Sequence, residues 1–143
     1  MFGSVLVGTD GSPRAERAVA EAVDIAKAQG ASLTLVAAYP GSDGHWEPIQ
    51  GSAAITKGDL RSVAEGLLMR AARHAENAGV SVDFEARAGD PAEVILDIAA
   101  EREADLIVVG NKGMAGAKRY LLGGVPNKIS HHATCTVMIV RTD

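Results

Sequence analysis

The stretch Leu106–Asn127, LIVVGNKGMAGAKRYLLGGVPN, joins the most strand-like run of the chain to a glycine-rich segment. The run Leu106–Val109 is apolar throughout, which is typical of a buried central strand. The glycines that follow it stand at positions 110, 113 and 116, and a pair stands at 123 and 124. Glycine accepts positive φ angles and lets a ligand approach the bare backbone, so this segment favours a loop whose N–H groups bind a phosphate. A surface loop in which the glycines only form turns is the alternative.

The place of this loop in the predicted fold supports the phosphate interpretation. A helix expected from about Val125 to His132 begins directly after Gly123 and Gly124. Its first N–H groups and the positive end of its dipole would attract an anion. In an open α/β sheet, ligands bind beyond the carboxyl ends of the strands, where a loop after Val109 would emerge.

The chain as a whole alternates between strand-like and helix-like segments. The strands are expected at Ser4–Gly8, Ser32–Ala38, Val80–Ala86, Leu106–Val109 and Thr136–Val140. The helices are expected from Pro13, capped by Ser12, to Gly30; over Asp59–Ala78; from a cap at Asp90-Pro91; and over Val125–His132. This order predicts an α/β fold, with a parallel five-stranded sheet and four helices on its two faces. The switch point of the sheet should fall between the first and fourth strands.

Composition restricts the class of protein. A chain of 143 residues fits a single domain, residues 1–143, and its 47% hydrophobic and 3% aromatic content predicts an aliphatic core. The net charge of -4 and the absence of a dense Lys/Arg run argue against a nucleic-acid partner. The apolar run at the N-terminus is too short for a signal peptide or a membrane span, and the single cysteine, Cys135, suits a reducing compartment. We therefore expect a cytoplasmic protein with no membrane partner.

Individual residues offer few catalytic candidates. Asp10, directly after the first strand, could accept hydrogen bonds from a base amine or a ribose hydroxyl, or could form an Asx turn with the backbone that follows it. His131 and His132 point about 100° apart on a helix, and no partner stands at zinc spacing, so no metal site is expected. The chain lacks a G-x-S-x-G elbow and a Walker A motif, so we assign no catalytic residue.

The glycine pattern and three flanking segments resemble the universal stress protein family. The pattern is Gly110-x-x-Gly113, nine residues, then Gly123. The segments VLVGTDGS, ADLIVVGNKG and LLGGVP occur in the order typical of that family, so the resemblance covers the whole chain. Lys112, Lys118 and Arg119 add positive charge within the loop, which modestly favours an anionic ligand.

The resemblance implies a doubly wound, Rossmann-like sheet of order 3-2-1-4-5 that binds an adenine nucleotide, in most members ATP, with or without Mg²⁺. It also implies a homodimer formed through the last strand, Thr136–Val140. Carried over by position, Asp10 would meet the adenine with Thr9 beside it, and Ala37 would lie against the base. The phosphate and ribose contacts would come from Gly110, Gly113, Gly123, Gly124 and Val125.

One position departs from the family pattern. The family has Ser or Thr after the third glycine, and this chain has Gly124. A lost hydrogen bond to a charged group costs about 1.5–3 kcal/mol, or about tenfold to a hundredfold in affinity. Family members with a similar GSVP segment include some specialised for cyclic AMP, which is the alternative ligand.

The resemblance thus implies a stress-response regulator that acts through nucleotide occupancy and dimerisation, with at most slow ATP hydrolysis. Cyclic AMP binding is one alternative function. A protein-interaction module that no longer binds nucleotide is another, since Gly124 removes a phosphate ligand.

Overall fold

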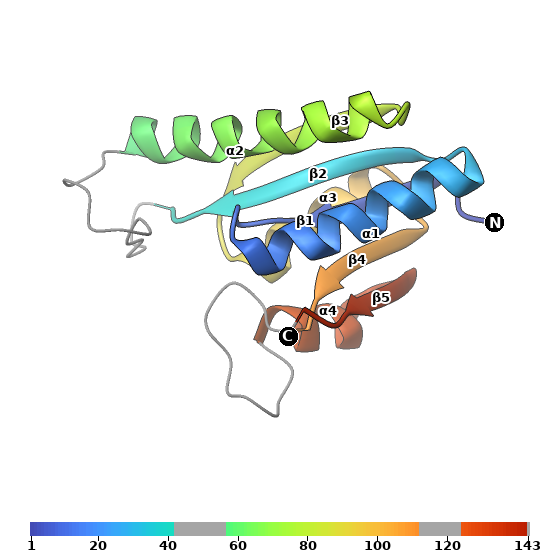
Figure 1. Cartoon of the computed structure of the whole chain (residues 1–143). Helices are drawn as coiled ribbons and strands as arrows, with labels where there is room; N and C mark the ends of the chain where they lie inside the picture. The colour runs from blue at the N-terminus through green and yellow to red at the C-terminus, as the bar shows by residue number, and fades with distance from the viewer. Residues whose placement is uncertain (42–56, 112–123, 143) are drawn as a thin grey trace.

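The computed structural model describes residues 1–41, 57–111 and 124–142. Strands and helices alternate along the chain (Figure 1). In order they are β1 (Ser4–Gly8), α1 (Pro13–Gln29), β2 (Ser32–Tyr39), α2 (Lys57–Asn77), β3 (Val82–Ala88), α3 (Pro91–Glu101), β4 (Leu106–Gly110), α4 (Gly124–His132) and β5 (Thr136–Val140). The strands pair in parallel in the order β3-β2-β1-β4-β5, which confirms the predicted fold class and sheet order.

The helices lie on both faces of the sheet, as Figure 1 shows. Side chains at alternate strand positions separate into two buried clusters because successive residues of a strand point to opposite faces. Val5 and Val7 pack with α1 and α2, whereas Leu6 packs with α3 and α4. The strands of the centre are therefore covered on both sides, which explains their continuous apolar sequence.

The start of β3 differs from the prediction. The alternating run Val80–Ala86 predicted a strand over those residues, but β3 spans Val82–Ala88. The Val80 N–H donates to the Ala75 carbonyl (3.1 Å), and Gly79 has a φ of +85°. Val80 thus belongs to the turn that ends α2, and its burial there, not pairing in the sheet, explains its apolar side chain.

Two N-caps fix helix starts at the carboxyl edge of the sheet. Ser12 Oγ accepts a hydrogen bond from the Ala15 N–H (3.2 Å), and Asp90 Oδ2 accepts one from the Glu93 N–H (3.1 Å). In both helices a proline follows the cap, where its missing N–H costs nothing. Both caps agree with the sequence prediction.

The switch point lies where it was predicted. β1 pairs with β2 on one side and with β4 on the other, with Val5 opposite Leu106. After β1 the chain enters α1, which packs on one face, whereas α4 packs on the opposite face before the chain enters β5. The carboxyl ends of β1 and β4 are therefore neighbours from which the chain departs in opposite directions.

At the amino edge, the Asp105 carboxylate fixes the register of β1 against β4. It accepts hydrogen bonds from the N–H groups of Gly3 (2.9 Å) and Ser4 (3.0 Å), and these bonds hold the pKa of Asp105 below its ordinary value. A carboxyl whose folded-state pKa is lowered stabilises the fold above its unfolded pKa and loses that contribution as the pH falls.

We therefore expect Asp105→Asn to lower the free energy of unfolding by about 1 kcal/mol near neutral pH, because these exposed bonds are screened by solvent. The difference from wild type should shrink below about pH 4, where the wild-type carboxyl also becomes protonated. Urea unfolding at several pH values measures it. Asp97→Asn, at an exposed position of α3, is the control, and a pH-independent difference for Asp105→Asn would contradict this account.

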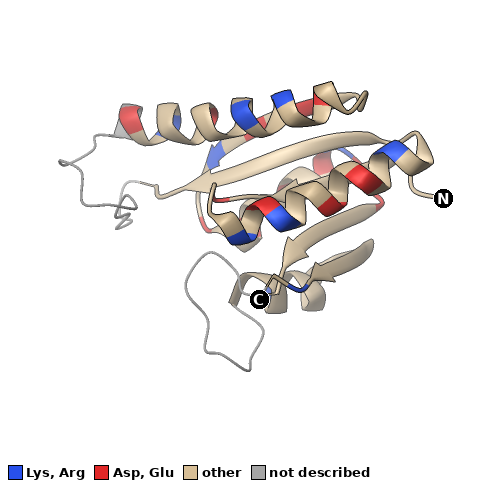
Figure 2. Ribbon diagram, in the orientation of Figure 1, with Lys and Arg blue, Asp and Glu red and all other residues tan. Residues whose placement is uncertain are grey.

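The two edges of the sheet differ in charge. On β3, Arg87 pairs with Glu101 (2.6 Å) and Asp83 pairs with Arg102 (2.6 Å), so ion pairs to the last residue of α3 and to its C-cap line this edge. β5, with sequence TVMIV, carries no charged residue, as Figure 2 shows. Charged side chains discourage pairing of an edge strand with another chain, so only the β3 edge is protected in this way.

Of the helices that the structure describes, none is both long and apolar enough to cross a membrane.

Candidate functional site

The candidate site begins at the end of β1, where Thr9 and Asp10 both hold the backbone. The Thr9 N–H donates to the Val36 carbonyl of β2 (2.8 Å), and Thr9 Oγ1 accepts from the Gly11 N–H (3.1 Å). Asp10 Oδ1 accepts from the Ser12 N–H (2.9 Å), so the Asx turn that the sequence allowed is present. A carboxylate accepts through both oxygens, and this turn uses one of them. The Asx turn and ligand binding by Asp10 are therefore compatible.

Gly11 permits the sharp turn between β1 and α1. Its φ of +80° is strained for any residue with a Cβ, and a Cβ there would lie 3.3 Å from Cδ2 of Leu67. The side chain of Leu67, from α2, thus covers this turn. The turn that follows Asp10 is therefore held by local hydrogen bonds and covered by α2 at Gly11.

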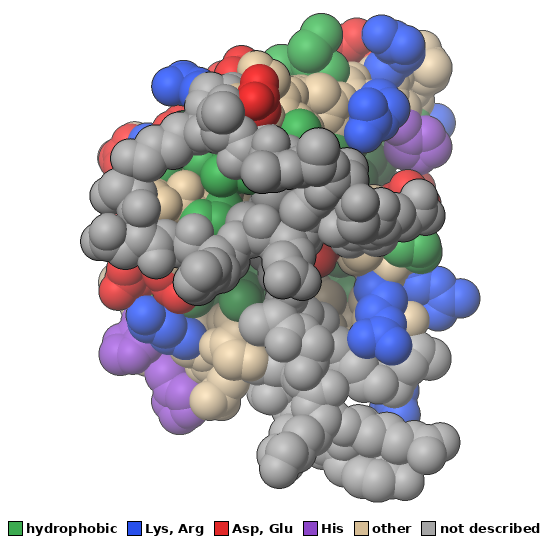
Figure 3. Space-filling view, turned by 90° about the vertical axis from the view of Figure 1, so that its left-hand side faces the viewer, with side chains coloured by type: hydrophobic (Ala, Val, Ile, Leu, Met, Phe, Trp, Pro, Cys, Tyr) green, Lys and Arg blue, Asp and Glu red, His purple; other side chains and the backbone are tan. Residues whose placement is uncertain are grey.

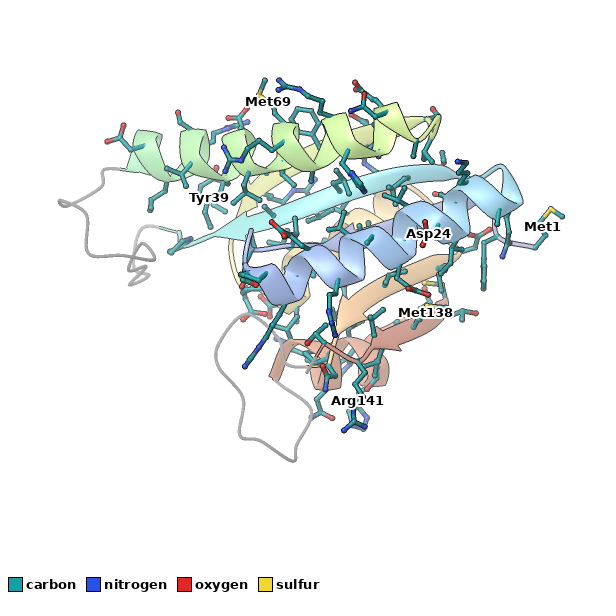
Figure 4. The ribbon with its side chains drawn as sticks, viewed as in Figure 1. Met1, Asp24, Tyr39, Met69, Met138 and Arg141 are labelled. Atoms are coloured by element: carbon teal, nitrogen blue, oxygen red, sulfur yellow. The ribbon has the colours of Figure 1, made fainter. Side chains whose placement is uncertain are left out.

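Ala37 is more deeply buried than a residue that contacts a ligand at the surface needs to be. It is 2% exposed and packs in the cluster beneath α1 and α2. β2 continues past it to Ala38 and Tyr39, which are less buried, and the Gly89 N–H donates to the Tyr39 carbonyl (2.8 Å). Figure 4 shows Tyr39 at the carboxyl end of β2, on the side of α2.

Tyr39 is the residue of β2 that the sequence prediction omitted. The prediction ended the second strand at Ala38, because Tyr39 precedes Pro40 and a segment rich in glycine. The signal that would have found Tyr39 is the strand propensity of tyrosine, which extends the run by one residue.

At the end of β4, Gly110 packs against the C-terminal segment. A Cβ on Gly110 would lie 3.3 Å from Cγ2 of Thr142. Asn111 follows, and its N–H donates to the Val140 carbonyl (2.9 Å). Close packing against Thr142 therefore favours glycine at position 110, in addition to the ligand contact that the sequence suggested.

Gly124 and Val125 begin α4 and have different surroundings. No atom of the described residues lies within 4 Å of a Cβ built on Gly124, and its φ is not positive. Val125 is 7% exposed and packs in the cluster with α3. Gly124 can therefore present its backbone to a ligand, whereas the Val125 side chain serves the core.

Lys128, one turn further along α4, was not singled out from the sequence. Its Nζ lies 3.2 Å from Glu93 Oε1 and 3.4 Å from Asp90 Oδ2, and these acids raise the pKa of Lys128, Glu93 most strongly. The contact ties the starts of α3 and α4 together at the carboxyl edge. No pattern in the sequence pairs residues so far apart.

The remaining predicted residues lie outside the described part of the chain. Gly113 and Gly123 are within residues 112–123, as are the loop cations Lys112, Lys118 and Arg119. Figure 3 looks onto this edge of the molecule, where hydrophobic side chains are visible between the segments drawn in grey. The structure thus brings together the ends of β1, β2 and β4 and the start of α4.

The described residues contain no cluster of three or more His, Cys, Asp or Glu side chains that could hold a metal ion. Cys135 is partly buried, and desolvation is the main cause that raises the pKa of its thiol. A thiol with a raised pKa is a poor nucleophile and metal ligand.

Comparison with known proteins places the chain in a family. The family model described as the universal stress protein family matches residues 1–141. Universal stress protein YxiE of Bacillus subtilis is 34% identical over 154 residues, covering 99% of this chain and all of the relative.

Solved structures agree with this assignment. A universal stress protein crystallised in complex with cAMP is 31% identical, with a TM-score of 0.75 over 99% of this chain and 98% of that one. Protein Rv1636 of Mycobacterium tuberculosis is 34% identical, with a TM-score of 0.62 over 99% of this chain and 97% of that one. The match of sequence and fold over nearly the whole chain shows that it belongs to the universal stress protein family.

Proposed function

We propose that this protein binds an adenine nucleotide at the carboxyl edge of β1 and β4 and acts through nucleotide occupancy and dimerisation. The observation that carries the proposal is the switch point, where Asp10, Gly110 and Gly124 stand at the ends of adjoining elements. Asp10 accepts hydrogen bonds from the base or ribose. The backbone N–H groups at Gly110 and at the start of α4 bind phosphate oxygens.

Two ligands fit this proposal, and ATP, with or without Mg²⁺, is the first. Cyclic AMP is the second, favoured by the related protein whose structure contains cAMP and by the missing hydroxyl at Gly124. A cyclic phosphate carries one negative charge and needs fewer ligands than a triphosphate does. Lys128 is already paired with two carboxylates, which also favours a ligand of lower charge.

The contrast between the sheet edges supports the dimer. β5 leaves Ile139 36% exposed, and Val137, Met138 and Val140 are only partly buried. A second copy of the chain, placed by a twofold axis, would cover these side chains and pair the edge backbone groups of both strands. The ion pairs at β3 leave that edge unsuited to the same contact.

Gly124→Ser tests the proposed phosphate contact. Among the described residues, none lies within 4 Å of a Cβ at position 124, so they leave room for the serine side chain, whose hydroxyl would add a hydrogen bond to the phosphate. We expect about tenfold tighter ATP binding by calorimetry, or about 1.4 kcal/mol. Gly124→Ala is the matched control. Alanine, like serine, has a higher helix propensity than glycine, but it adds no hydroxyl.

The outcomes separate the candidate functions. Tighter ATP binding by the serine variant alone supports the phosphate site at α4. Equal affinity of all three proteins would place the phosphate elsewhere. No binding of ATP or cyclic AMP by wild type or by Gly124→Ser would favour the protein-interaction module instead.

A further inference from the structure

A cluster formed by Gly110, Asn111, Val140 and Thr142 joins the candidate site to the C-terminal segment. Thr142 lies beyond β5, yet it is only 7% exposed and is one of three buried polar residues in the described part of the chain. The ends of β4 and β5 lie side by side, and Arg141 stands just past β5 (Figures 1 and 4). The segment after β5 is therefore docked on the strand that enters the candidate site.

Hydrogen bonds account for this docking. Asn111 Oδ1 accepts from the Thr142 N–H (3.0 Å) and from Thr142 Oγ1 (2.9 Å). The Asn111 N–H donates to the Val140 carbonyl (2.9 Å), which extends the pairing of β4 with β5 by one residue beyond Gly110 and Val140. An amide oxygen has two lone pairs, so Thr142 satisfies this acceptor fully.

Packing reinforces the same contact. Cγ2 of Thr142 lies 3.3 Å from the position of a Cβ on Gly110, so a side chain at residue 110 would require Thr142 to move by a few tenths of an ångström. The end of β4 and the residues after β5 are therefore in close contact at this point. A displacement of either one breaks the partly buried hydrogen bonds between Asn111 and Thr142.

We infer that Asn111 and Thr142 are positioning residues that couple the nucleotide site to the β5 edge. The inference rests on the proposed function, because Gly110 is a proposed ligand contact and β5 is the proposed dimer edge. Pairing of β5 with a second copy restrains Val140 and Thr142, and these hold Gly110 in the geometry that binds phosphate. By linkage, each nucleotide that binds strengthens the dimer by the same factor by which dimerisation strengthens binding at one site.

The test compares ATP affinity in dimeric and monomeric protein, with and without the Thr142 hydroxyl. Calorimetry gives the dissociation constant for ATP and for cyclic AMP of wild type and of Ile139→Lys, a variant designed to be monomeric. For each nucleotide, the dissociation constant of Ile139→Lys divided by that of wild type measures the coupling. The same pair is then measured with Thr142→Val, which keeps the methyl group and the N–H but removes the hydroxyl.

We expect a ratio of about fivefold or more in the wild-type background and a ratio near one with Thr142→Val. Thr142→Ser should restore the wild-type ratio, because it keeps the hydroxyl. Thr34→Val is the control, since it makes the same change at another buried threonine, and it should leave the ratio unchanged even where it lowers the melting temperature.

Three results would overturn the inference. They are a ratio near one in the wild-type background, a ratio unaffected by Thr142→Val, and an equal loss with Thr34→Val. Nucleotide binding with no coupling overturns only this inference. The absence of binding by every variant overturns the proposed function as well. Should Thr142→Val fail to fold, the ratio for Asn111→Ala decides between the same outcomes.

Discussion

Asp10→Ala is expected to weaken adenine-nucleotide binding by about tenfold to a hundredfold. The variant removes the carboxylate that we propose accepts hydrogen bonds from the ligand, and a bond to a charged group contributes about 1.5–3 kcal/mol. It also removes the acceptor of the Ser12 N–H, so a small loss of stability should accompany the loss of affinity. Calorimetric titration measures the affinity, and thermal unfolding measures the stability.

Asp10→Asn separates these two effects. Its carbonyl oxygen can still accept from the Ser12 N–H, so the turn into α1 should survive. The amide places a donor where the ligand needs an acceptor, so the affinity should fall nearly as far as with alanine. Full affinity in Asp10→Asn, with weak binding by Asp10→Ala, would mean that Asp10 acts only through the turn.

Ile139→Lys is expected to convert the proposed dimer into a monomer. The twofold symmetry of a homodimer places the change in both copies, so each interface loses two apolar contacts and gains two charges that must leave water. We expect the dissociation constant of the dimer to rise at least about a hundredfold. Sedimentation at micromolar concentration measures it.

Met69→Lys is the matched control for this experiment. Met69 is 52% exposed on α2, and Figure 4 shows it on the outer side of that helix, away from β5. The same change of an exposed apolar side chain to lysine should leave the dimer intact there. A wild-type protein that sediments as a monomer, or a dimer that survives Ile139→Lys, would contradict the assignment of the β5 edge.

The order of elements was predictable because local signals agree with the final fold. Ser12 and Asp90 each precede a proline at a helix start, and both cap their helices as expected. Gly30 ends α1 in the left-handed conformation that its sequence position indicated. Each of these signals depends only on residues close by in the sequence, so it can be recognised from the sequence alone.

Other features depend on contacts between distant residues. Apolar and polar residues alternate after Val80 in a pattern typical of a strand, yet Val80 is buried in the turn that ends α2. The Asn111–Thr142 contact joins residues 31 positions apart, and Lys128 reaches Asp90 across 38. Only the three-dimensional arrangement brings these residues together, and no periodicity or spacing indicates them.

The site was predictable in outline and not in its details. Asp10, Gly110 and Gly124 do stand at the edge where β1, β4 and α4 meet. The burial of Ala37 beneath α1 and α2, and the packing of Thr142 on Gly110, depend on how the layers close over the sheet. Direct contact of each residue with a nucleotide stays a prediction.

The most direct test of the account is a calorimetric titration of the purified wild-type protein with ATP, ADP and cyclic AMP, with GTP as the control for the base. Before titration, bound small molecules are removed by unfolding and refolding, so that an occupied site does not mask binding. The account predicts saturable binding of ATP or cyclic AMP, one nucleotide per chain, and at least about tenfold weaker binding of GTP. Refolded protein that gives no heat with any adenine nucleotide would contradict it.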